Sequence, residues 1–436
     1  MSLIAIIAYG TRGDVQPAIA LGKTLHGRGH RVRLVASGNF KAWIESHGLE
    51  AAASDVDIQQ LMQTGLGQEW VMRGTNPLAQ VRVMHRLLTR HGDRMARDAW
   101  DGCCDAEVVI SSFTSDVLAV SIAEKLGAPH VSMPPQPVMI ATRDGRAVPN
   151  APLPNRVSIL NYLFSRFFLQ PFPWLLLGKA NNRMRQELLG LPLQSGRENV
   201  AARRRMLVVH GYSRHVVPHP ADWPHNFHTT GYWFLDEESE WRPPPDLRAF
   251  LEAGPPPVYI GFGSMTGRDP EQLTRLLLEA VRRSGQRAVL LSGWAGIGGL
   301  DLPPEVFCIE RAPHGVLFPL MAAIVHHGGA GTTGASLRAG RPTIIVPHMA
   351  DQPFWGRRVA DLGLGPEPIP RPRLSVGRLA QAMRRAASDE EMQRRAAELG
   401  RRIRAEDGRE HAADLIEAWL RQKETGQQRQ ASEEEG

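Results

Sequence analysis

The sequence predicts an α/β protein built from two doubly wound parallel sheets. Short apolar runs of strand length alternate with helical stretches over residues 1–219, and the same alternation begins again near residue 246. Between these regions lies a stretch rich in Pro, Trp and His, which ends in three consecutive prolines. Strands that alternate with helices form parallel sheets covered by helices. We therefore expect an N-terminal domain over 1–219, a linker over 220–245 and a C-terminal domain over 246–404.

The N-terminal domain begins with a strand–helix–strand pattern. Residues 3–8 are an apolar strand, residues 10–14 form a turn, and residues 15–25 form a helix with Pro17 in its first turn. Proline is tolerated there because the first N–H groups of a helix have no partner within it. Residues 31–36 form the next strand. The pattern is typical of a βαβ unit.

Asp14 has two interpretations at the end of this first turn. Ligands of doubly wound sheets bind at the carboxyl ends of the strands, and a carboxylate there can accept a proton from an acceptor hydroxyl. Asp is also a favoured N-cap residue, and the helix is expected to begin directly after it. The residues of this region alone favour neither interpretation.

The remainder of the N-terminal domain continues the alternation. We expect strands at 107–111, 129–133 and 206–210, and helices at 115–126 and 176–189. Residues 159–177 are rich in aromatic residues and Leu but contain Arg166, Gln170 and two prolines. We expect them to form helices that line a hydrophobic pocket or core, with peripheral membrane contact as the alternative. The chain has no apolar run of the length that a membrane span requires.

The C-terminal domain repeats the pattern and ends in a helix. Residues 257–262 form a strand, 263–267 a glycine-containing turn, 270–283 a helix and 287–291 a further strand. Residues 405–424 have the apolar spacing of an amphipathic helix. The polar tail over 425–436 is expected to be disordered.

The glycine-rich segment of residues 326–334 predicts a phosphate site. An apolar run leads into it, and residues 335–340 form a short helix after it. A glycine turn that opens a helix presents unpaired N–H groups and the positive end of the helix dipole. Thr332 and Thr333 add hydroxyl donors, and His327 adds a further donor or a positive charge.

An acid and an amide follow at the end of the next strand, residues 342–346. Asp351 and Gln352 stand side by side there and are suited to accept hydrogen bonds from sugar hydroxyls and to donate to them. Phosphate donors on one loop, with a carboxylate and a carboxamide on the next, fit a nucleoside diphosphate that carries a polyhydroxyl group.

Two other interpretations of the glycine segment remain open. Residues 329–334 fit G-x-G-x-x-G, and Asp351 lies near the position of a ribose-binding acid, which is typical of a dinucleotide-dependent oxidoreductase. That fingerprint usually opens the first βαβ unit of a domain, whereas this one lies deep in the second half of the chain. A turn that only packs a helix on a strand is the other alternative. Glycines alone would not require His327, the threonine pair and the acid–amide pair.

Composition narrows the class of protein. The chain has 436 residues, 51 Lys+Arg against 45 Asp+Glu and a net charge of +6, a mild excess that does not indicate a nucleic-acid binder. Cys103, Cys104 and Cys308 lack metal-ligand spacing and are too few for a disulfide framework. The sequence shows no secretory signal pattern. We therefore expect a cytoplasmic protein.

Together these residues resemble the GT-B glycosyltransferases that use nucleotide sugars, above all the sterol glucosyltransferases and their bacterial relatives that glycosylate lipids and natural products. The resemblance spans nearly the whole chain, from residue 10 to the terminal helix, and it implies that this helix over 405–424 packs back on the N-terminal domain. The occurrence of residues 327–333 together with residues 347–356 is highly specific for this family. Residues 311–314 with 317–319 resemble the segment that holds the nucleotide base.

The resemblance implies an inverting transfer in which Asp14 is the general base for the acceptor hydroxyl. The loop residues Thr11, Arg12 and Gly13 would lie at the acceptor. The donor residues that it implies are the diphosphate binders His327, Gly328, Gly329, Gly331, Thr332, Thr333 and Ser264, the sugar contacts Asp351 and Gln352, and the base contacts Arg311, Ala312, His314 and Trp294. It implies no metal, because the helix N-terminus can stabilise the departing diphosphate.

Three features depart from the family pattern. Ser111 and Ser112 stand near the position where plant relatives have an Asp behind a catalytic His, a partner that a carboxylate base at Asp14 does not need. Relatives often have Phe-Phe-Gly before the Asp-Gln pair, where this chain has His348, Met349 and Ala350. Many relatives also have Trp in place of Arg311, and Trp294 is a candidate substitute as the stacking partner of the base.

The resemblance also implies the substrates. UDP-glucose is the favoured donor, with dTDP-deoxysugars used by relatives that have similar loops. The expected acceptor is a bulky apolar molecule with a hydroxyl, such as a sterol, hopanoid, glycolipid or polyketide. No nucleic acid is expected as a partner, and the inner face of a membrane is the expected place of any peripheral contact. A catalytically silent protein that binds nucleotide sugars is a further alternative, against which the presence of Asp14 argues.

Overall fold

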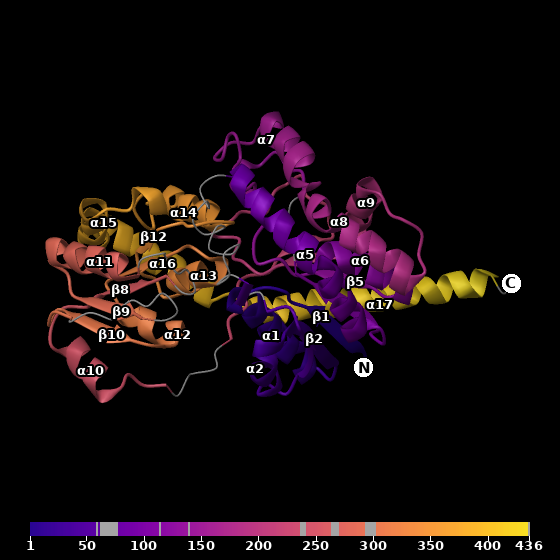
Figure 1. Ribbon diagram of the computed structural model, residues 1–436, viewed down its shortest axis with the longest axis horizontal. Helices are drawn as coiled ribbons and strands as arrows, with labels where there is room; N and C mark the ends of the chain where they lie inside the picture. Colours follow the sequence, from indigo (N-terminus) through magenta and orange to yellow (C-terminus); the bar gives the residue numbers. More distant parts are fainter. Residues whose placement is uncertain are drawn as a thin grey trace. The chain divides into compact units, whose positions relative to one another are not determined.

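The computed structural model describes residues 1–57, 60–61, 77–112, 115–137, 140–235, 241–262, 270–292 and 302–434. The described residues divide into two compact units. Unit 1 contains those within 1–58, 85–235 and 406–436, and unit 2 contains those within 59–84 and 236–405. Figure 1 shows the helices and strands of both units, each of which is a parallel sheet covered by helices. The fold class that the sequence predicts is confirmed.

Unit 1 contains a seven-stranded sheet with the strand order β3-β2-β1-β4-β5-β6-β7, and all neighbouring strands are parallel. The strands are β1 (Leu3–Ile7), β2 (Arg31–Ser37), β3 (Glu50–Ser54), β4 (Val108–Ser111), β5 (His130–Ser132), β6 (Leu207–His210) and β7 (Phe227–Thr229). Every residue of β1 is buried, as expected for a central parallel strand with both faces covered.

Helices cover both faces of this sheet. The main helices are α1 (Arg12–Gly27), α2 (Lys41–Glu45), α5 (Pro77–Cys103), α6 (Asp116–Leu126), α7 (Ile159–Phe164), α8 (Phe172–Met184), α9 (Gly196–Arg205) and α17 (Gly408–Glu434). The helices α1 and α17 share one hydrophobic core with Ile4 and Ile6 of β1. On the other face α5 approaches the sheet so closely at Gly102 that a Cβ there would lie 2.5 Å from Val35.

The helix α17 belongs to unit 1, although it follows unit 2 in the chain. It contacts α1 and β6, and Ala412, Ala413, Ile416 and Leu420 lie in the core of unit 1. The predicted return of the terminal helix to the N-terminal domain is therefore confirmed. The helix continues to Glu434, whereas the sequence predicts a disordered tail from residue 425.

The edge strand β7 lies where the sequence predicts a linker over 220–245. It pairs with β6 through Val208 and Phe227, and unit 1 extends to Leu235. The strand is only three residues long and lies among Pro, Trp and His residues, so its own pattern carries no strand signal.

Unit 2 contains a five-stranded parallel sheet with the order β10-β9-β8-β11-β12. Its strands are β8 (Val258–Gly261), β9 (Ala288–Leu291), β10 (Val306–Ile309), β11 (Ala323–His326) and β12 (Thr343–Ile345). Its helices are α10 (Pro245–Glu252), α11 (Pro270–Ser284), α12 (His314–Leu317), α13 (Ala330–Arg338), α14 (Gln352–Asp361), α15 (Val376–Ser388) and α16 (Glu390–Arg404). Leu277 and Met383 pack on one face of the sheet, and Leu247 and Phe318 pack on the other.

The strand order reverses at one place in each sheet. In unit 1 the reversal lies between β1 and β4, where Ile7 is paired with Ser111. In unit 2 it lies between β8 and β11, where Gly261 is paired with His326. Loops that leave the carboxyl ends of strands at such a reversal form the ligand crevice of doubly wound sheets. The loop of Asp14 follows β1, and the glycine loop follows β11.

In the part of the chain that the structure describes, no helix combines the length and the hydropathy that crossing a membrane requires.

Candidate functional site

The glycine loop enters α13 without a side-chain cap. Gly329 is the N-cap residue, and the first hydrogen bond of the helix runs from the N–H of Thr333 to the carbonyl of Gly329 at 2.9 Å. The N–H groups at the start of a helix have no acceptor within it, so they are available to an anion. Among the described residues, no heavy atom lies within 4 Å of the place that a Cβ of Gly331 would occupy. No described residue therefore covers α13 at Gly331, in its first turn.

Two buried residues fix the path of this loop. Gly328 has a φ of +92°, and a Cβ there would lie 2.6 Å from the side chain of Ile345 on β12. His326 is buried at the end of β11, and its Nδ1 accepts the N–H of Gly328 at 2.9 Å. Burial lowers the pKa of His326 well below its usual value, so the ring is neutral, as an acceptor nitrogen must be. Sequence reasoning assigned no role to His326.

Two polar atoms of the loop are buried without a hydrogen-bond partner among the described residues. They are Nδ1 of His327 and Oγ1 of Thr333. Buried polar atoms in native proteins are nearly always paired, so two such atoms at one helix N-terminus indicate a ligand. Burial also lowers the pKa of His327 to about 4. Both residues are among the predicted diphosphate binders, and Thr332 is half-buried beside them.

Asp351 lies at the N-terminus of α14, after β12. Its Oδ2 accepts a hydrogen bond from Nε1 of Trp355 at 2.7 Å, and Trp355 is completely buried. This bond holds the carboxylate in one orientation. Burial raises the pKa of Asp351 to about 6, which brings its ionisation close to neutral pH.

The side chain of Gln352 supports the loop that precedes it. Its Oε1 accepts the N–H groups of His348 at 2.7 Å and of Met349 at 3.1 Å. The side chain is buried, so this oxygen is held by the protein. Oε1 of Gln352 thus stabilises the loop of His348 and Met349. The contact of Gln352 with sugar hydroxyls stays a prediction.

Ala350 adopts a backbone conformation that disfavours alanine. Its φ is +54°, in the left-handed region. In the family resemblance this position corresponds to the glycine of Phe-Phe-Gly, which adopts a positive φ without steric cost. The loop of this chain thus keeps the conformation of a glycine turn without the glycine.

The residues predicted to hold the base lie between β10 and α13. Arg311 is exposed and Ala312 is half-buried. The ring of His314 stacks on Phe318 at 4.2 Å, and Phe318 is buried in the core. The helix α12, which begins at His314, contacts α13, so the segment adjoins the glycine loop. Ser264 and Trp294 lie outside the described residues.

In unit 1 Asp14 helps to start α1. The helix begins at Arg12, three residues earlier than the sequence predicts, so Thr11 is the N-cap residue and Asp14 is the third residue of the helix. Oδ2 of Asp14 accepts the N–H of Thr11 at 2.9 Å. Gly10 must be a glycine here, because a Cβ would lie 2.0 Å from this same oxygen. The predicted N-cap position of Asp14 is wrong, and its catalytic role stays a prediction.

The predicted acceptor-loop residues belong to the start of α1. Arg12 places its guanidinium 4.7 Å from the ring centroid of Trp43 on α2. Gly13 is exposed, and the nearest atom to a Cβ there would be Oγ1 of Thr11 at 3.7 Å.

A buried polar cluster lies at β4 and β5 of the same sheet. Ser111 and Ser132 donate hydrogen bonds to the carboxylate of Asp116 at 2.5 and 2.9 Å, and Nε2 of His130 lies 2.8 Å from Oγ of Ser111. Burial raises the pKa of Asp116 to about 6 and lowers the pKa of His130 to about 3. Of these residues, sequence reasoning considered only Ser111. The cluster joins two strands through side chains, and His130 is its half-buried member.

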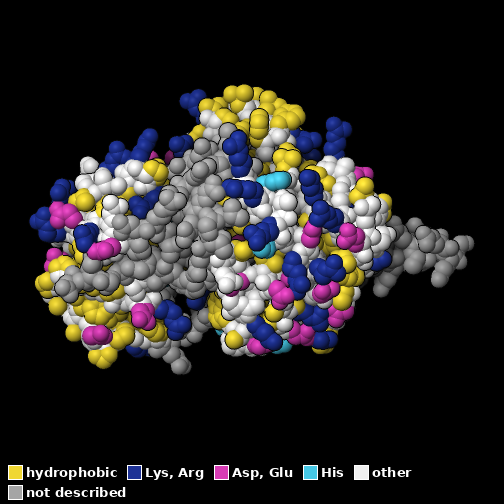
Figure 2. All heavy atoms as spheres, viewed as in Figure 1, with side chains coloured by type: hydrophobic (Ala, Val, Ile, Leu, Met, Phe, Trp, Pro, Cys, Tyr) yellow, Lys and Arg dark blue, Asp and Glu magenta, His cyan; other side chains and the backbone are white. Residues whose placement is uncertain are grey.

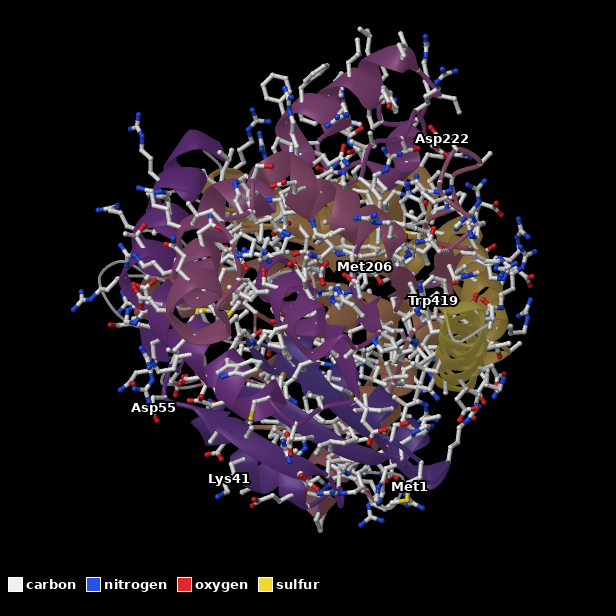
Figure 3. The ribbon with its side chains drawn as sticks, turned by 90° about the vertical axis from the view of Figure 1, so that its right-hand side faces the viewer. Met1, Lys41, Asp55, Met206, Asp222 and Trp419 are labelled. Atoms are coloured by element: carbon white, nitrogen blue, oxygen red, sulfur yellow. The ribbon has the colours of Figure 1, made fainter. Side chains whose placement is uncertain are left out.

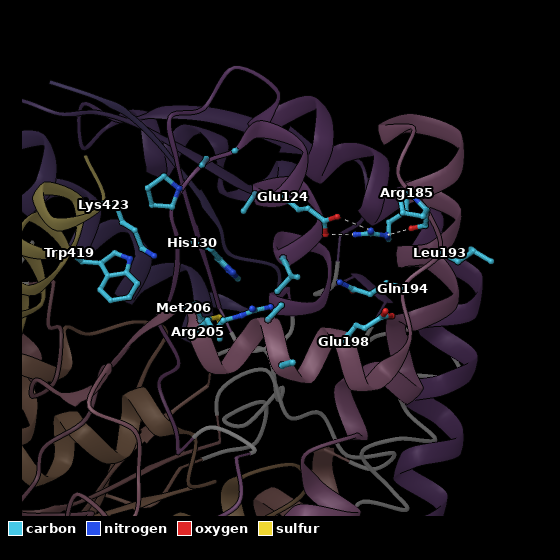
Figure 4. A pocket seen from close by; sticks show the side chains of 18 residues that line it. Glu124, His130, Arg185, Leu193, Gln194, Glu198, Arg205, Met206, Trp419 and Lys423 are labelled. Carbon is cyan, nitrogen blue, oxygen red and sulfur yellow. Dashed lines mark hydrogen bonds and ion pairs between the residues drawn. The ribbon is translucent and has the colours of Figure 1, made fainter. Parts of the chain in front are cut away.

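A pocket of about 710 Å³ lies in unit 1 at the N-terminal ends of its strands, whereas Asp14 follows the carboxyl end of β1 (Figure 4). His130 and Met206 line it at the N-terminal ends of β5 and β6, and Trp419 of α17 lines it as well. Arg185 pairs with Glu124 in its wall at 2.7 Å. None of the predicted site residues lines this pocket. Among the described residues, no group of His, Cys, Asp and Glu is arranged to hold a metal ion.

Both halves of the chain match known glycosyltransferase domains. Residues 4–139 match the glycosyltransferase family 28 N-terminal domain. Residues 289–417 match the erythromycin biosynthesis protein CIII-like C-terminal domain. The chain is 38% identical over 420 residues to a sterol 3-beta-glucosyltransferase of Aspergillus terreus, a match that covers 93% of this chain and 29% of that protein. The chain therefore spans less than a third of the length of this relative.

Solved structures share the fold over almost the whole chain. The glycosyltransferase of kitacinnamycin has a TM-score of 0.67 at 22% identity and covers 96% of this chain and 98% of its own. The glycosyltransferase VinC in complex with dTDP has a TM-score of 0.61 at 19% identity, with 96% and 100% covered.

The fold and the two domain matches define the class of protein: it is a GT-B protein with two doubly wound units. Within that class the chain carries a glycosyltransferase family 28 N-terminal domain over residues 4–139 and an erythromycin biosynthesis protein CIII-like C-terminal domain over residues 289–417. These matches favour the glycosyltransferase interpretation of the glycine loop over the dinucleotide-dependent oxidoreductase.

Proposed function

We propose that this protein transfers a hexose from a nucleoside diphosphate sugar to a hydroxyl of a bulky apolar acceptor, with inversion at the sugar carbon. The observation that carries the proposal is the pair of unpartnered buried atoms, Nδ1 of His327 and Oγ1 of Thr333, beside the open N-terminus of α13. A diphosphate placed there would accept hydrogen bonds from both side chains and from the first N–H groups of the helix.

The favoured substrates are UDP-glucose and a sterol-like acceptor. The relative from Aspergillus terreus is a sterol 3-beta-glucosyltransferase, which supports glucose as the sugar and a sterol as the acceptor. The fold neighbour VinC is in complex with dTDP, so dTDP-sugars are the competing donors. Hopanoids, glycolipids and polyketides are the other acceptors of the same chemical kind.

In the proposed mechanism unit 2 stabilises the leaving group. Negative charge grows on the diphosphate as the bond from the sugar carbon to its oxygen breaks. The dipole and N–H groups of α13 are already aimed at that charge, which lowers the barrier without reorganisation. His327 is neutral in the free protein and donates a hydrogen bond, and an anion beside it would raise its pKa. Asp351, oriented by Trp355, accepts a hydrogen bond from a sugar hydroxyl.

Asp14 is proposed to receive the proton of the acceptor. A carboxylate is too weak a base to deprotonate an alcohol in advance, so the proton moves as the new bond between the acceptor oxygen and the sugar carbon forms. The acceptor attacks from the face opposite the diphosphate, which inverts the configuration. The hydrogen bond from Thr11 holds the carboxylate in place.

The first experiment is calorimetric binding of UDP, dTDP, GDP and NAD to the full chain without added metal. We expect UDP or dTDP to bind. Thr333→Val keeps the volume of the side chain and removes the unpartnered hydroxyl, so it should weaken this binding about tenfold, the usual value of a hydrogen bond to a charged group. Thr425→Val, on the exposed end of α17, is the matched control. Binding of NAD with no response to the nucleoside diphosphates would exclude the proposal.

The second experiment separates donor binding from catalysis. Asp14→Asn should leave the affinity for the nucleoside diphosphate unchanged and lower the rate of transfer to a sterol by about 10²- to 10⁴-fold, the usual range of general-base catalysis. Full activity of this variant would exclude Asp14 as the base. A wild-type protein that binds the donor and transfers to no acceptor would be the silent binding protein.

We also propose that the protein contacts a membrane peripherally, at the inner face. Acceptors of the proposed kind partition into lipid, so a transferase that reaches them gains from contact with the lipid surface.

A further inference from the structure

A helix of unit 1 carries its apolar side chains on the outside. This helix is α7, which continues into the π-helical segment η3 (Ser165–Leu169). Six apolar side chains here and just before are between 41% and 69% exposed, and we call them the apolar crest: Val157, Ile159, Leu160, Leu163, Phe167 and Phe168. Figure 2 shows hydrophobic side chains gathered at the top of the view, where Figure 1 labels α7.

The inward face of the same helix is polar. Asn161 and Ser165 are completely buried. Nδ2 of Asn161 donates to the carbonyls of Leu153 and Arg156 at 2.9 and 2.8 Å, and its Oδ1 accepts the N–H of Leu153 at 3.0 Å. Oγ of Ser165 accepts the N–H of Thr142 at 3.2 Å. An amphipathic helix on a protein core normally has the reverse arrangement.

These buried bonds fix the orientation of the crest. Asp222, which is labelled in Figure 3, holds the adjoining segment. Its carboxylate accepts hydrogen bonds from Oγ1 of Thr142 at 2.5 Å and from the N–H of Arg143 at 2.7 Å. Rolling the helix to bury the crest would leave Asn161 and Ser165 unpaired, at a cost for each buried polar group. The sequence predicts helices that line a pocket or core over 159–177, and for the crest residues this prediction is wrong.

The segment that carries the crest is basic in sequence. Residues 145–186 contain six Lys and Arg and no Asp or Glu. Arg146, Arg183 and Arg185 pair with acids outside this range. Within the described residues, Arg156 and Arg166 have no ion-pair partner, and both are exposed on the segment that carries the crest. The crest is therefore an apolar surface accompanied by uncompensated positive charge.

We propose that the apolar crest docks on the surface of an anionic lipid membrane. Its apolar side chains would enter the headgroup region, and Arg156 and Arg166 would lie against lipid phosphates. A second copy of the chain is a poorer occupant, because a symmetric contact between two crests would bring the same arginines together. The inference rests on the membrane contact proposed above, and it adds the surface that makes the contact and the charge of the lipid.

The apolar part of the proposal is tested by vesicle sedimentation of the full chain. Phosphatidylcholine vesicles with and without phosphatidylserine are compared. Leu160→Gln and Phe167→Gln should each weaken binding to the anionic vesicles roughly tenfold, the order expected when an inserted side chain is lost. Leu193→Gln is the matched control, because Leu193 is 59% exposed against 53% for Leu160 and lies outside the crest.

The electrostatic part needs a second pair of variants. Arg156→Gln and Arg166→Gln should each lower the preference for phosphatidylserine about fivefold and leave binding to pure phosphatidylcholine nearly unchanged. Arg97→Gln, at an exposed position of α5, should change neither. An unchanged preference in both crest variants would overturn the assignment of an anionic lipid.

Two outcomes would overturn docking itself. One is equal vesicle binding by the wild type and both apolar crest variants. The other is a wild-type dimer that dissociates in these variants while vesicle binding stays the same, which would make the crest a protein interface. UDP binding by the wild type separates the two proposals. A wild type that binds UDP but no vesicles contradicts the crest alone, whereas a wild type that binds vesicles but no nucleotide contradicts the proposed transfer reaction alone.

Discussion

Two side chains of the candidate donor site have pKa values that burial shifts in opposite directions. Burial lowers the pKa of His327 to about 4 and raises the pKa of Asp351 to about 6. A diphosphate favours the protonated form of His327, whereas a sugar hydroxyl that donates a hydrogen bond favours the ionised form of Asp351. The two parts of one donor molecule should therefore respond to pH with opposite signs.

This difference predicts the pH dependence of donor binding. The ratio of the affinity for UDP-glucose to that for UDP should fall as the pH drops through 6, because Asp351 becomes protonated and ceases to accept from the sugar. Calorimetry with both ligands on either side of pH 6 measures the ratio. Asp351→Asn should make the ratio independent of pH, and a wild-type ratio that does not change would rule out the sugar contact. UDP alone should bind more tightly as the pH falls, and His327→Gln should remove that gain.

Ala350 predicts a stabilising substitution. Ala350→Gly removes the steric cost of a left-handed alanine, which exceeds the added flexibility of glycine, so unit 2 should gain up to about 1 kcal/mol in its free energy of unfolding. Denaturant unfolding measures the change. Ala387→Gly, in the right-handed conformation of α15, should instead lose about 1 kcal/mol. If Ala350→Gly and Ala387→Gly both lowered the free energy of unfolding, the backbone conformation of Ala350 would carry no strain.

The residues of the donor loop could be predicted because their chemistry is local. A glycine turn, two threonines and a histidine indicate an anion site by spacing alone. The residues that hold the loop could not be found this way. His326 accepts from Gly328, Gln352 holds His348, and Trp355 orients Asp351 only because the fold brings them together.

At the scale of elements, the start of α1 gives Asp14 two functions that can be separated. Asn keeps an oxygen that can accept the N–H of Thr11, whereas Ala does not. Asp14→Ala should therefore lower the free energy of unfolding of unit 1 by about 1 kcal/mol, the usual value of a cap, and Asp14→Asn should lower it by much less. Thermal unfolding measures both, and turnover should fall in both. Equal destabilisation would mean that the carboxylate charge, and not the hydrogen bond, stabilises the helix start.

The elements themselves were predictable where the pattern is strong. The central strands and α1 follow from apolar runs and turn residues, although α1 begins three residues early because the capping residue is Thr11. The spacing of Ile159, Leu163 and Phe167 is compatible with a helix but cannot say which face is buried. That depends on where Asn161 finds partners, which is a property of the folded unit.

At the scale of the molecule, α17 is attached to unit 1 by two kinds of contact. Arg28 lies 2.5 Å from Glu410, 2.8 Å from Asp414 and 3.2 Å from Glu417. Ile416 is completely buried in the core of unit 1. Ion pairs with exposed acids contribute little to stability, whereas a buried aliphatic side chain contributes several times more. The apolar face of α17 should therefore dominate its attachment.

Two variants test this ranking. Ile416→Ala should lower the free energy of unfolding of unit 1 by about 2–4 kcal/mol, and Arg28→Gln by less than about 1 kcal/mol. Calorimetric unfolding is measured with and without UDP, because bound UDP should raise the unfolding temperature of unit 2 and so identify its transition. Neither variant should change the unfolding temperature of unit 2. An effect of Arg28→Gln as large as that of Ile416→Ala would reverse the ranking.

The path of the chain through the two units also determines the order in which their cores can form during synthesis. The chain leaves unit 1 after Leu235 and returns to it at Glu406, so all of residues 236–405 emerge from the ribosome before the last part of the first core. Domains generally fold as units while the chain is being made. We expect unit 2 to complete its core first, while unit 1 keeps an uncovered apolar face until α17 is made. A nascent chain that stops short of that helix would present this face to chaperones, so the synthesis of α17 sets the moment at which unit 1 can close its core.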